Sequence, residues 1–289
     1  MVLETSKDIP SIPDFTTINI ETGNEQDKGN PKSTQLRARH TVTLPIINFK
    51  DMKVEQVELI FLKYCHKFGV TPIKIYSYLV EGKKLILHRY KLNNGIAKAL
   101  ALVLPFFTKL EEISLSDNTL EDDSLAVIVE AAKHCPKFKS LKIMNNKPGK
   151  YFMETLYQNI YHQSRSLKCL NLKGCRTLNA QFSNLMKILK RLLDLQSLNL
   201  SDVKLNISAV QQLGNYIKDN ETITKLSLSN CNLMTFKALT LVKALIKNDS
   251  ICFLDLSNNN LTSENYEIAS CLGILIRTHY YLMHINFSH

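Results

Sequence analysis

The 289-residue sequence has no tryptophan, only nine glycines, and no long apolar run. No stretch approaches the roughly 18 apolar residues that span a bilayer. Charges and prolines occupy the first 15 residues, where a signal peptide requires an apolar segment. The seven cysteines include no CxxC pair, so they fit neither a disulfide framework nor a zinc site. We therefore expect a folded cytoplasmic protein without a membrane segment.

Motifs that carry catalysis or bind cofactors are also missing. The sequence contains no GxGxxG, GxxxxGK[ST], GxSxG or HExxH pattern. Such motifs cradle phosphates, expose a nucleophile or ligate zinc. His279, His284 and His289 are evenly spaced, but no carboxylate pattern accompanies them as a metal site would require. We expect no enzyme activity, no cofactor and no metal.

The net charge is +10, and it is unevenly distributed. Residues 1–54 hold seven acidic and seven basic side chains, which leaves 29 basic against 19 acidic residues in the remainder. A basic folded part favours acidic partners. Nucleic acid is the least expected partner, because the cations are interspersed with acids and are not interleaved with stacking aromatics.

An internal repeat covers most of the chain. The template LxxLxLxxNxL begins at residue 82 and recurs at residues 110, 138, 167, 195, 223, 251 and 282, and we number these repeats 1 to 8. Clear copies include "LEEISLSDNTL" at 110, "ITKLSLSNCNL" at 223 and "ICFLDLSNNNL" at 251. A regular period of this length indicates a stacked repeat architecture.

This template resembles the leucine-rich repeat family, in its ribonuclease-inhibitor-like class, over residues 82–289. The resemblance implies an α/β solenoid shaped as a curved horseshoe, with parallel strands on the concave face and helices on the convex face. The residues agree, because each LxL alternation fits a short half-buried strand and the segments between return to helical spacing. The repeats also look similar to those of cytoskeletal proteins, including subunits of ciliary axonemes.

The chain divides into three predicted parts. Residues 1–50 lack a sustained period and are expected to form a flexible or extended arm, and residues 51–81 a helical cap that ends a first helix at Gly69 and begins a second at Thr71-Pro72. Residues 82–289 form the repeat domain, in which Ser208 with Gln211 indicates a capping box. Repeat 8 is incomplete, so we expect a partner or further sequence to cover that end.

The ninth template position has a structural role in this family, where its side chain binds backbone groups of the loop between repeats. Asparagine can donate and accept there, cysteine is a weaker substitute, and Val203 can do neither, so we expect a weak point at Val203. Cys169 and Cys252 are the candidates for reactive thiols, although plain surface thiols explain them as well. The expected structural ladder consists of Asn118, Asn146, Cys175, Cys231 and Asn259.

The strand residues that flank the buried leucines should project from the open face of the sheet, where a partner could bind. A second candidate surface is "GKYFMETLYQNIYH", whose tyrosines either shield the core or dock a partner. The candidate partner-binding residues are Lys84, His88, Arg89, Lys142, Lys173, Lys225, Phe253, Tyr151, Tyr157 and Tyr161.

Two classes of function follow. The first is a non-enzymatic scaffold or structural subunit of an intracellular assembly, cytoskeletal or axonemal, with tubulin or another acidic protein surface as partner. The alternative is a regulator of a small GTPase, because activating proteins of the nuclear-transport type resemble this repeat class. It would depend on Arg89 and Lys84, and the acidic tail of that family is missing here. Ribonuclease inhibition is disfavoured, since such an inhibitor is acidic and this chain is basic.

Overall fold

The computed structural model divides the chain into two compact units, Met1–Lys53 and Val54–His289. It describes residues 15–21, 39–45, 53–163, 167–234, 236–259, 261 and 266–288, and of residues 15–21, 39–45, 81 and 160–163 it describes the backbone alone. In the first unit, β1 (Phe15–Glu21) pairs antiparallel with β2 (Arg39–Pro45), with Phe15 opposite Pro45. The sequence predicted no regular element in this segment.

The second unit is built on one open sheet of eight parallel strands, arranged in chain order from β3 to β10. Each strand has three residues and belongs to one repeat. The strands are β3 (Lys84–Ile86), β4 (Glu112–Ser114), β5 (Ser140–Lys142), β6 (Cys169–Asn171), β7 (Ser197–Asn199), β8 (Lys225–Ser227), β9 (Phe253–Asp255) and β10 (His284–Asn286).

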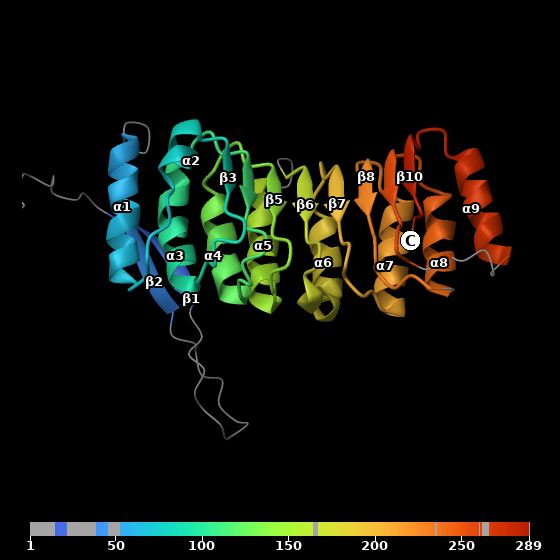
Figure 1. The fold of residues 1–289 in the computed structure, drawn as a ribbon, viewed down its shortest axis with the longest axis horizontal. Helices are drawn as coiled ribbons and strands as arrows, with labels where there is room; N and C mark the ends of the chain where they lie inside the picture. The colour runs from blue at the N-terminus through green and yellow to red at the C-terminus, as the bar shows by residue number, and fades with distance from the viewer. Residues whose placement is uncertain are drawn as a thin grey trace, which may run out of the picture. The chain divides into compact units, whose positions relative to one another are not determined.

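Helices alternate with these strands and form a layer along the sheet (Figure 1). Seven α-helices follow strands β3 to β9, and a short 3-10 helix accompanies two of them. They are α3 (Asn94–Val103), η1 (Leu104–Phe106), α4 (Asp122–Ala132), α5 (Lys150–Gln163), η2 (Arg176–Gln181), α6 (Phe182–Leu189), α7 (Ile207–Lys218), α8 (Phe236–Leu245) and α9 (Tyr266–Thr278). This strand and helix order confirms the predicted α/β leucine-rich-repeat-like solenoid.

The core lies between the sheet and the helix layer. The middle residue of each strand from β3 to β9 is fully buried, from Leu85 at 0% exposure to Leu254 at 3%. Burying one leucine stabilises the fold by about 1.5–3 kcal/mol, and in a solenoid the neighbouring repeat supplies the cover. In β10, the last strand, Ile285 is only half-buried.

Two helices precede the first repeat. Helix α1 (Val54–Lys67) is followed by Gly69 with φ of +64°, and α2 (Tyr76–Glu81) ends at Gly82 in the left-handed region. The second helix therefore begins at Tyr76 and not at Thr71-Pro72 as predicted. The backbone between them has no regular structure, and Ile75 at its end is buried, so this segment is held by the core before the helix begins.

Two further points of the sequence-based interpretation are settled by the structure. Helix α7 is capped by Asn206, whose Oδ1 accepts the Ala209 N–H at 2.8 Å, so the predicted capping box at Ser208 is wrong. Asn206 is placed earlier, where its extended backbone suits an N-cap. Among the described residues no helix is long and apolar enough to cross a membrane.

The last repeats carry exposed apolar side chains. On α9 and the turn that follows it, Tyr266, Ile276, Tyr280 and Met283 are each more than half exposed. The prediction that a partner or further sequence covers this end stays a prediction.

Candidate functional site at the loop edge of the sheet

The loop edge of the sheet is formed by template positions 8 to 11, directly after each strand. Asn118 shows how these loops are joined. Its Nδ2 donates to Leu87 O of the preceding repeat at 2.6 Å and to Leu115 O at 2.8 Å, and its Oδ1 accepts the Leu92 N–H at 3.4 Å. Buried backbone groups need such partners, so one side chain closes its own loop and ties it to the neighbour.

The same arrangement recurs at Asn146 and Asn259. Asn146 donates to Leu115 O at 3.0 Å, and Asn259 donates to Leu228 O at 2.7 Å. Both are 2% exposed. Their amide oxygens accept backbone N–H groups of the preceding repeat, as Asn118 does.

Cys175 and Cys231 occupy this position in repeats 4 and 6. Their Sγ atoms donate to Ile143 O and Leu200 O, each at 3.2 Å. A thiol cannot replace the amide oxygen, which in the repeats with asparagine at this position accepts the N–H of the eleventh residue of the preceding repeat. At Cys175 no such acceptor is needed, because the eleventh residue of repeat 3 is Pro148, which has no N–H. Burial raises the pKa of both thiols to about 12, so they stay protonated and are poor nucleophiles.

The ladder is interrupted at Val203 in repeat 5. The preceding loop, in repeat 4, closes on itself: the Cys175 N–H donates to Leu172 O at 3.1 Å and the Leu178 N–H donates to Cys175 O at 3.0 Å. This loop continues as the 3-10 helix η2. Among the described repeats, repeat 4 is the one in which a 3-10 helix stands between the strand and the α-helix. Val203 is fully buried and leaves none of these groups without a partner.

Position 8 forms a second row along the loop edge. Its residues have left-handed backbones with φ between +53° and +70°, and this row comprises Arg89, Asp117, Asn145, Gly174, Asp202, Asn230 and Asn258. Two Asp–Asn pairs bridge neighbouring repeats. Asn145 donates to Asp117 Oδ1 at 2.6 Å, and Asn230 donates to Asp202 Oδ1 at 2.8 Å. Gly174 lies between the pairs and interrupts the row.

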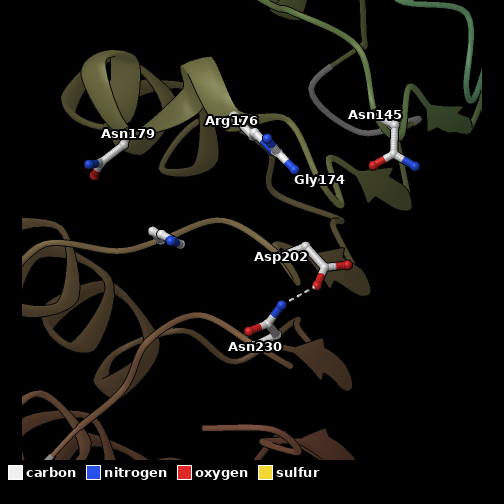
Figure 2. Close-up of a pocket in the computed structure, with 7 residues that line it drawn as sticks. Asn145, Gly174, Arg176, Asn179, Asp202 and Asn230 are labelled. Carbon is white, nitrogen blue, oxygen red and sulfur yellow. Dashed lines mark hydrogen bonds between the residues drawn. The ribbon is translucent and has the colours of Figure 1, made fainter.

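A hollow of about 480 Å³ opens where this row is interrupted. Figure 2 shows Asn145 on one side of Gly174 and the Asp202–Asn230 pair on another, with the Arg176 guanidinium directed into the same space. We call this the Gly174 hollow; its lining residues are Asn145, Gly174, Arg176, Asn179, Asp202, Lys204 and Asn230.

The cations expected on the open face are mostly engaged by neighbouring acids. Lys142 Nζ lies 2.8 Å from Glu112, and Lys173 Nζ lies 3.4 Å from Asp202. Arg89 Nε lies 3.8 Å from Asp117 Oδ2. Such pairs reduce the charge that these side chains present to a partner.

The remaining open-face candidates are in different surroundings. His88 Nε2 is hydrogen-bonded to Ser114 Oγ at 2.6 Å, and Lys225 Nζ lies 4.9 Å from the centre of the Phe253 ring. Lys84 is exposed and makes no ion pair within the described part of the chain. The structure therefore does not gather the predicted residues into one site.

The tyrosines of α5 lie on the helix layer, away from the strands. Tyr157 is half-buried, with the Arg191 guanidinium carbon 4.2 Å from its ring centre. Tyr151 is also half-buried, and its N–H donates to Asp122 Oδ2 at 2.9 Å. The side chain of Tyr161 lies outside the described residues. The alternatives of core shielding and partner docking therefore both stay open.

Sequence reasoning missed a run of cations at template position 10. Lys91, Lys147, Arg176 and Lys204 stand at this position in repeats 1, 3, 4 and 5, and we call them the basic ridge. Lys147 pairs with Glu121 at 2.6 Å. Among the described residues, Lys91, Arg176 and Lys204 make no ion pair. Aligning position 10 would have revealed the ridge, but the open-face positions alone do not include it.

Metal binding and acid–base chemistry have little support at this edge. Within the described residues there is no group of three His, Cys, Asp or Glu side chains that could hold a metal. His88 with Ser114 resembles a base and nucleophile, but Ser114 is 1% exposed, so a substrate could not reach its Oγ. Cys169 and Cys252 are half-buried.

The chain matches no protein-family model and no curated protein. Among solved structures it is similar to one described as Leiomodin-1 Actin-Binding Site 2, with 14% identity over 72% of this chain and 91% of that one, at a TM-score of 0.27. It is also similar to the tropomodulin C-terminal domain of Caenorhabditis elegans, with 12% identity over 70% and 90% of the two chains, at 0.26. These scores carry no functional argument, and the ribonuclease-inhibitor-like class stays a resemblance of sequence pattern.

Proposed function

We propose that this protein is a non-enzymatic scaffold that binds an acidic surface of another protein through its loop edge. The observation that carries the proposal is the basic ridge. Arg176 and Lys204 stand at equivalent positions of adjacent repeats and make no ion pair among the described residues, whereas the open-face Lys142 and Lys173 pair with acids. Unpaired cations on a rigid edge favour association with acidic partners.

The rigidity of the edge supports the same proposal. Each loop is joined to its neighbour by backbone hydrogen bonds, such as Asn145 N–H to Lys173 O at 2.8 Å, as well as by the ladder side chains. A surface that is already ordered loses little conformational entropy on binding. No catalytic step is included, since the ladder thiols are protonated and Ser114 is inaccessible.

In finer terms, we propose a cytoskeletal partner in the cytoplasm, with the acidic microtubule lattice, including that of the ciliary axoneme, as the specific candidate. The support is the net charge of +10 together with the basic ridge. Binding of this kind should weaken as salt screens the charges, because the Debye length falls from about 30 Å at 0.01 M to about 8 Å at 0.15 M.

Co-pelleting of the full chain with microtubules at increasing salt tests this proposal, with actin filaments as a second acidic polymer. We expect pelleting at low salt that Arg176→Glu/Lys204→Glu abolishes. The matched control is Lys187→Glu/Lys190→Glu, which reverses two exposed charges on or beside α6 of repeat 4, away from the loop edge. If both double variants lose pelleting equally, the basic ridge is not the binding surface. If the wild-type chain does not pellet with microtubules even at low salt, it does not bind the lattice directly.

The alternative, regulation of a small GTPase, would depend on Arg89 and Lys84. Arg89 would first have to leave Asp117, and no observation at this corner favours the alternative. Loss of stimulated GTP hydrolysis in Arg89→Ala would be the result that supports it.

A further inference from the structure

We propose that the Gly174 hollow receives one carboxylate side chain of an extended acidic segment of the partner protein. This inference rests on the proposed function, and it names the chemistry that the centre of the loop edge recognises. Its basis is a local departure from an otherwise regular repeat.

The backbone does not require glycine at residue 174. Its φ is +70°, but Asn145, Asp202 and Asn230 hold nearly the same left-handed conformation with φ of +54°, +60° and +53°. Asparagine and aspartate tolerate this region better than most residues. The property that distinguishes Gly174 is therefore the missing side chain. The Asn145 amide lies where its Cβ would stand, and the hollow opens beside it.

The lining supplies positive charge. Arg176 and Lys204 have no ion-pair partner among the described residues. Asp202 also lines the hollow, but Lys173 at 3.4 Å and the Asn230 amide at 2.8 Å offset its charge. A guanidinium can bind a carboxylate through two parallel hydrogen bonds. A phosphate dianion would interact less favourably with Asp202, because like charges in one site repel.

The shape and the remaining polar groups suit a main chain that runs along the edge. Asn145 Oδ1 lies over Gly174, 1.8 Å from the point where a Cβ would stand, and receives no hydrogen bond within the described residues. It is therefore available to a peptide N–H. A segment in this position would donate backbone N–H groups to the side-chain oxygens of Asn145 and Asp202, and its carboxylate would bind the Arg176 guanidinium.

Fluorescence anisotropy with a labelled, capped peptide of about twelve glutamate and glycine residues tests this at low salt. We expect Gly174→Asn, which keeps the charge and suits the left-handed backbone, to weaken binding by at least about tenfold. Arg176→Gln should do the same. The matched control is Lys91→Gln, which removes one charge from the same template position in repeat 1 and should change the affinity less than about threefold.

The outcomes test the Gly174 hollow separately from binding by the basic ridge. If the wild-type chain binds the peptide and all three variants weaken it equally or not at all, the hollow is overturned while the scaffold proposal survives. If the wild-type chain does not bind the peptide, acidic-segment binding at the loop edge fails as well. Tighter binding of a matched phosphoserine peptide, or equal binding of a glutamine peptide, overturns the assignment of a carboxylate.

A folding control keeps the test interpretable. In Gly174→Asn the flexible Asn145 amide must move aside, so the melting temperature of every variant is measured. Should Gly174→Asn fail to fold, Arg176→Lys replaces it. This variant keeps the charge but loses the two-pronged donor, so we expect a loss of about three- to tenfold. Unchanged affinity of Arg176→Lys would contradict recognition of a carboxylate in the hollow.

Discussion

In repeats 2, 3 and 7 an asparagine amide holds the loop after the strand, whereas in repeats 4 and 5 the loop closes through its own backbone. Asn118 both donates and accepts across the boundary between repeats. Val203 neither donates nor accepts, and the Cys231 thiol only donates. The N–H groups of the preceding position-9 residues, Cys175 and Val203, therefore bond to Leu172 O and Leu200 O of their own repeats.

A solenoid can therefore change one loop locally while its sheet stays regular. Strands β6 and β7 keep the same register as the others, with Leu170 opposite Leu198. What changes is the outer edge, where η2 begins at Arg176 and the position-8 row is interrupted at Gly174. The region that departs from the template is therefore also the region that offers a hollow.

The largest expected effect comes from the two ladder positions that carry a thiol in place of an amide, and it appears at alkaline pH. The Cys175 and Cys231 thiols have pKa values raised from 9.0 to about 12 by burial, so the unfolded chain loses these protons first. Their stabilisation is complete below pH 9 and is lost as the pH rises toward 12. Each thiol should lower the free energy of unfolding by about 1.4 kcal/mol per pH unit in that window.

Urea unfolding at pH 7.5 and pH 10.5 measures this effect. The control is Cys175→Ser/Cys231→Ser, which cannot ionise at these positions. Between the two pH values we expect the wild-type chain to lose about 4 kcal/mol more than the double variant. Identical pH dependence of both proteins would show that the thiols are not protected in the ladder.

An amide-held loop should break when its asparagine is removed. In Asn259→Ala the Cys231 and Leu233 N–H groups lose their acceptor, so we expect the free energy of unfolding to fall by about 1–3 kcal/mol. Asn258→Ala is the neighbouring control, because Asn258 is exposed and its side chain makes one long hydrogen bond among the described residues, to Ser229 Oγ at 3.4 Å. Chemical denaturation compares the two, and equal losses would contradict the assigned roles.

The period and the alternation of leucines were sufficient to predict the solenoid, because both are local properties of the sequence. Each LxL places both of its apolar residues in the core, as Leu85 with Leu87 and Leu226 with Leu228 show. The template also identified Asn118 and Asn259, since one position per repeat has to satisfy the loop. Interactions that recur with the repeat can therefore be predicted from one chain.

The ion pairs and the hollow could not be predicted in this way. Whether Lys142 is available to a partner depends on Glu112 in the preceding repeat, at a distance that only the three-dimensional structure gives. In the sequence, Gly174 cannot be distinguished from a glycine that its backbone conformation requires. The φ values of the equivalent residues show that other residue types adopt this conformation. The pairing of β1 with β2 was missed because neither strand belongs to a repeated pattern.

A smaller effect is expected from adding the missing amide at the interruption. In Val203→Asn the new side chain would be buried, and its oxygen would find the Cys175 N–H already bonded to Leu172 O and the Leu178 N–H to Cys175 O. We expect a loss of about 1–2 kcal/mol in thermal or urea unfolding. If the variant were instead more stable, the loop of repeat 4 would be able to use an asparagine amide as the other loops do, and its backbone closure would not replace that amide.

The smallest effect is expected when the thiol of the backbone-closed loop is removed. Ile143 O, which accepts from Cys175 Sγ, also accepts from Asn146 Nδ2 at 3.0 Å, so no carbonyl is left without a partner in Cys175→Ala. The cost should be limited to a small cavity, about 1 kcal/mol, and Cys175→Ser should cost less than that. Urea unfolding of both variants beside Asn259→Ala gives the comparison directly. A loss from Cys175→Ala as large as that from Asn259→Ala would mean that the thiol carries the loop as an amide does, and that backbone closure in repeat 4 contributes little.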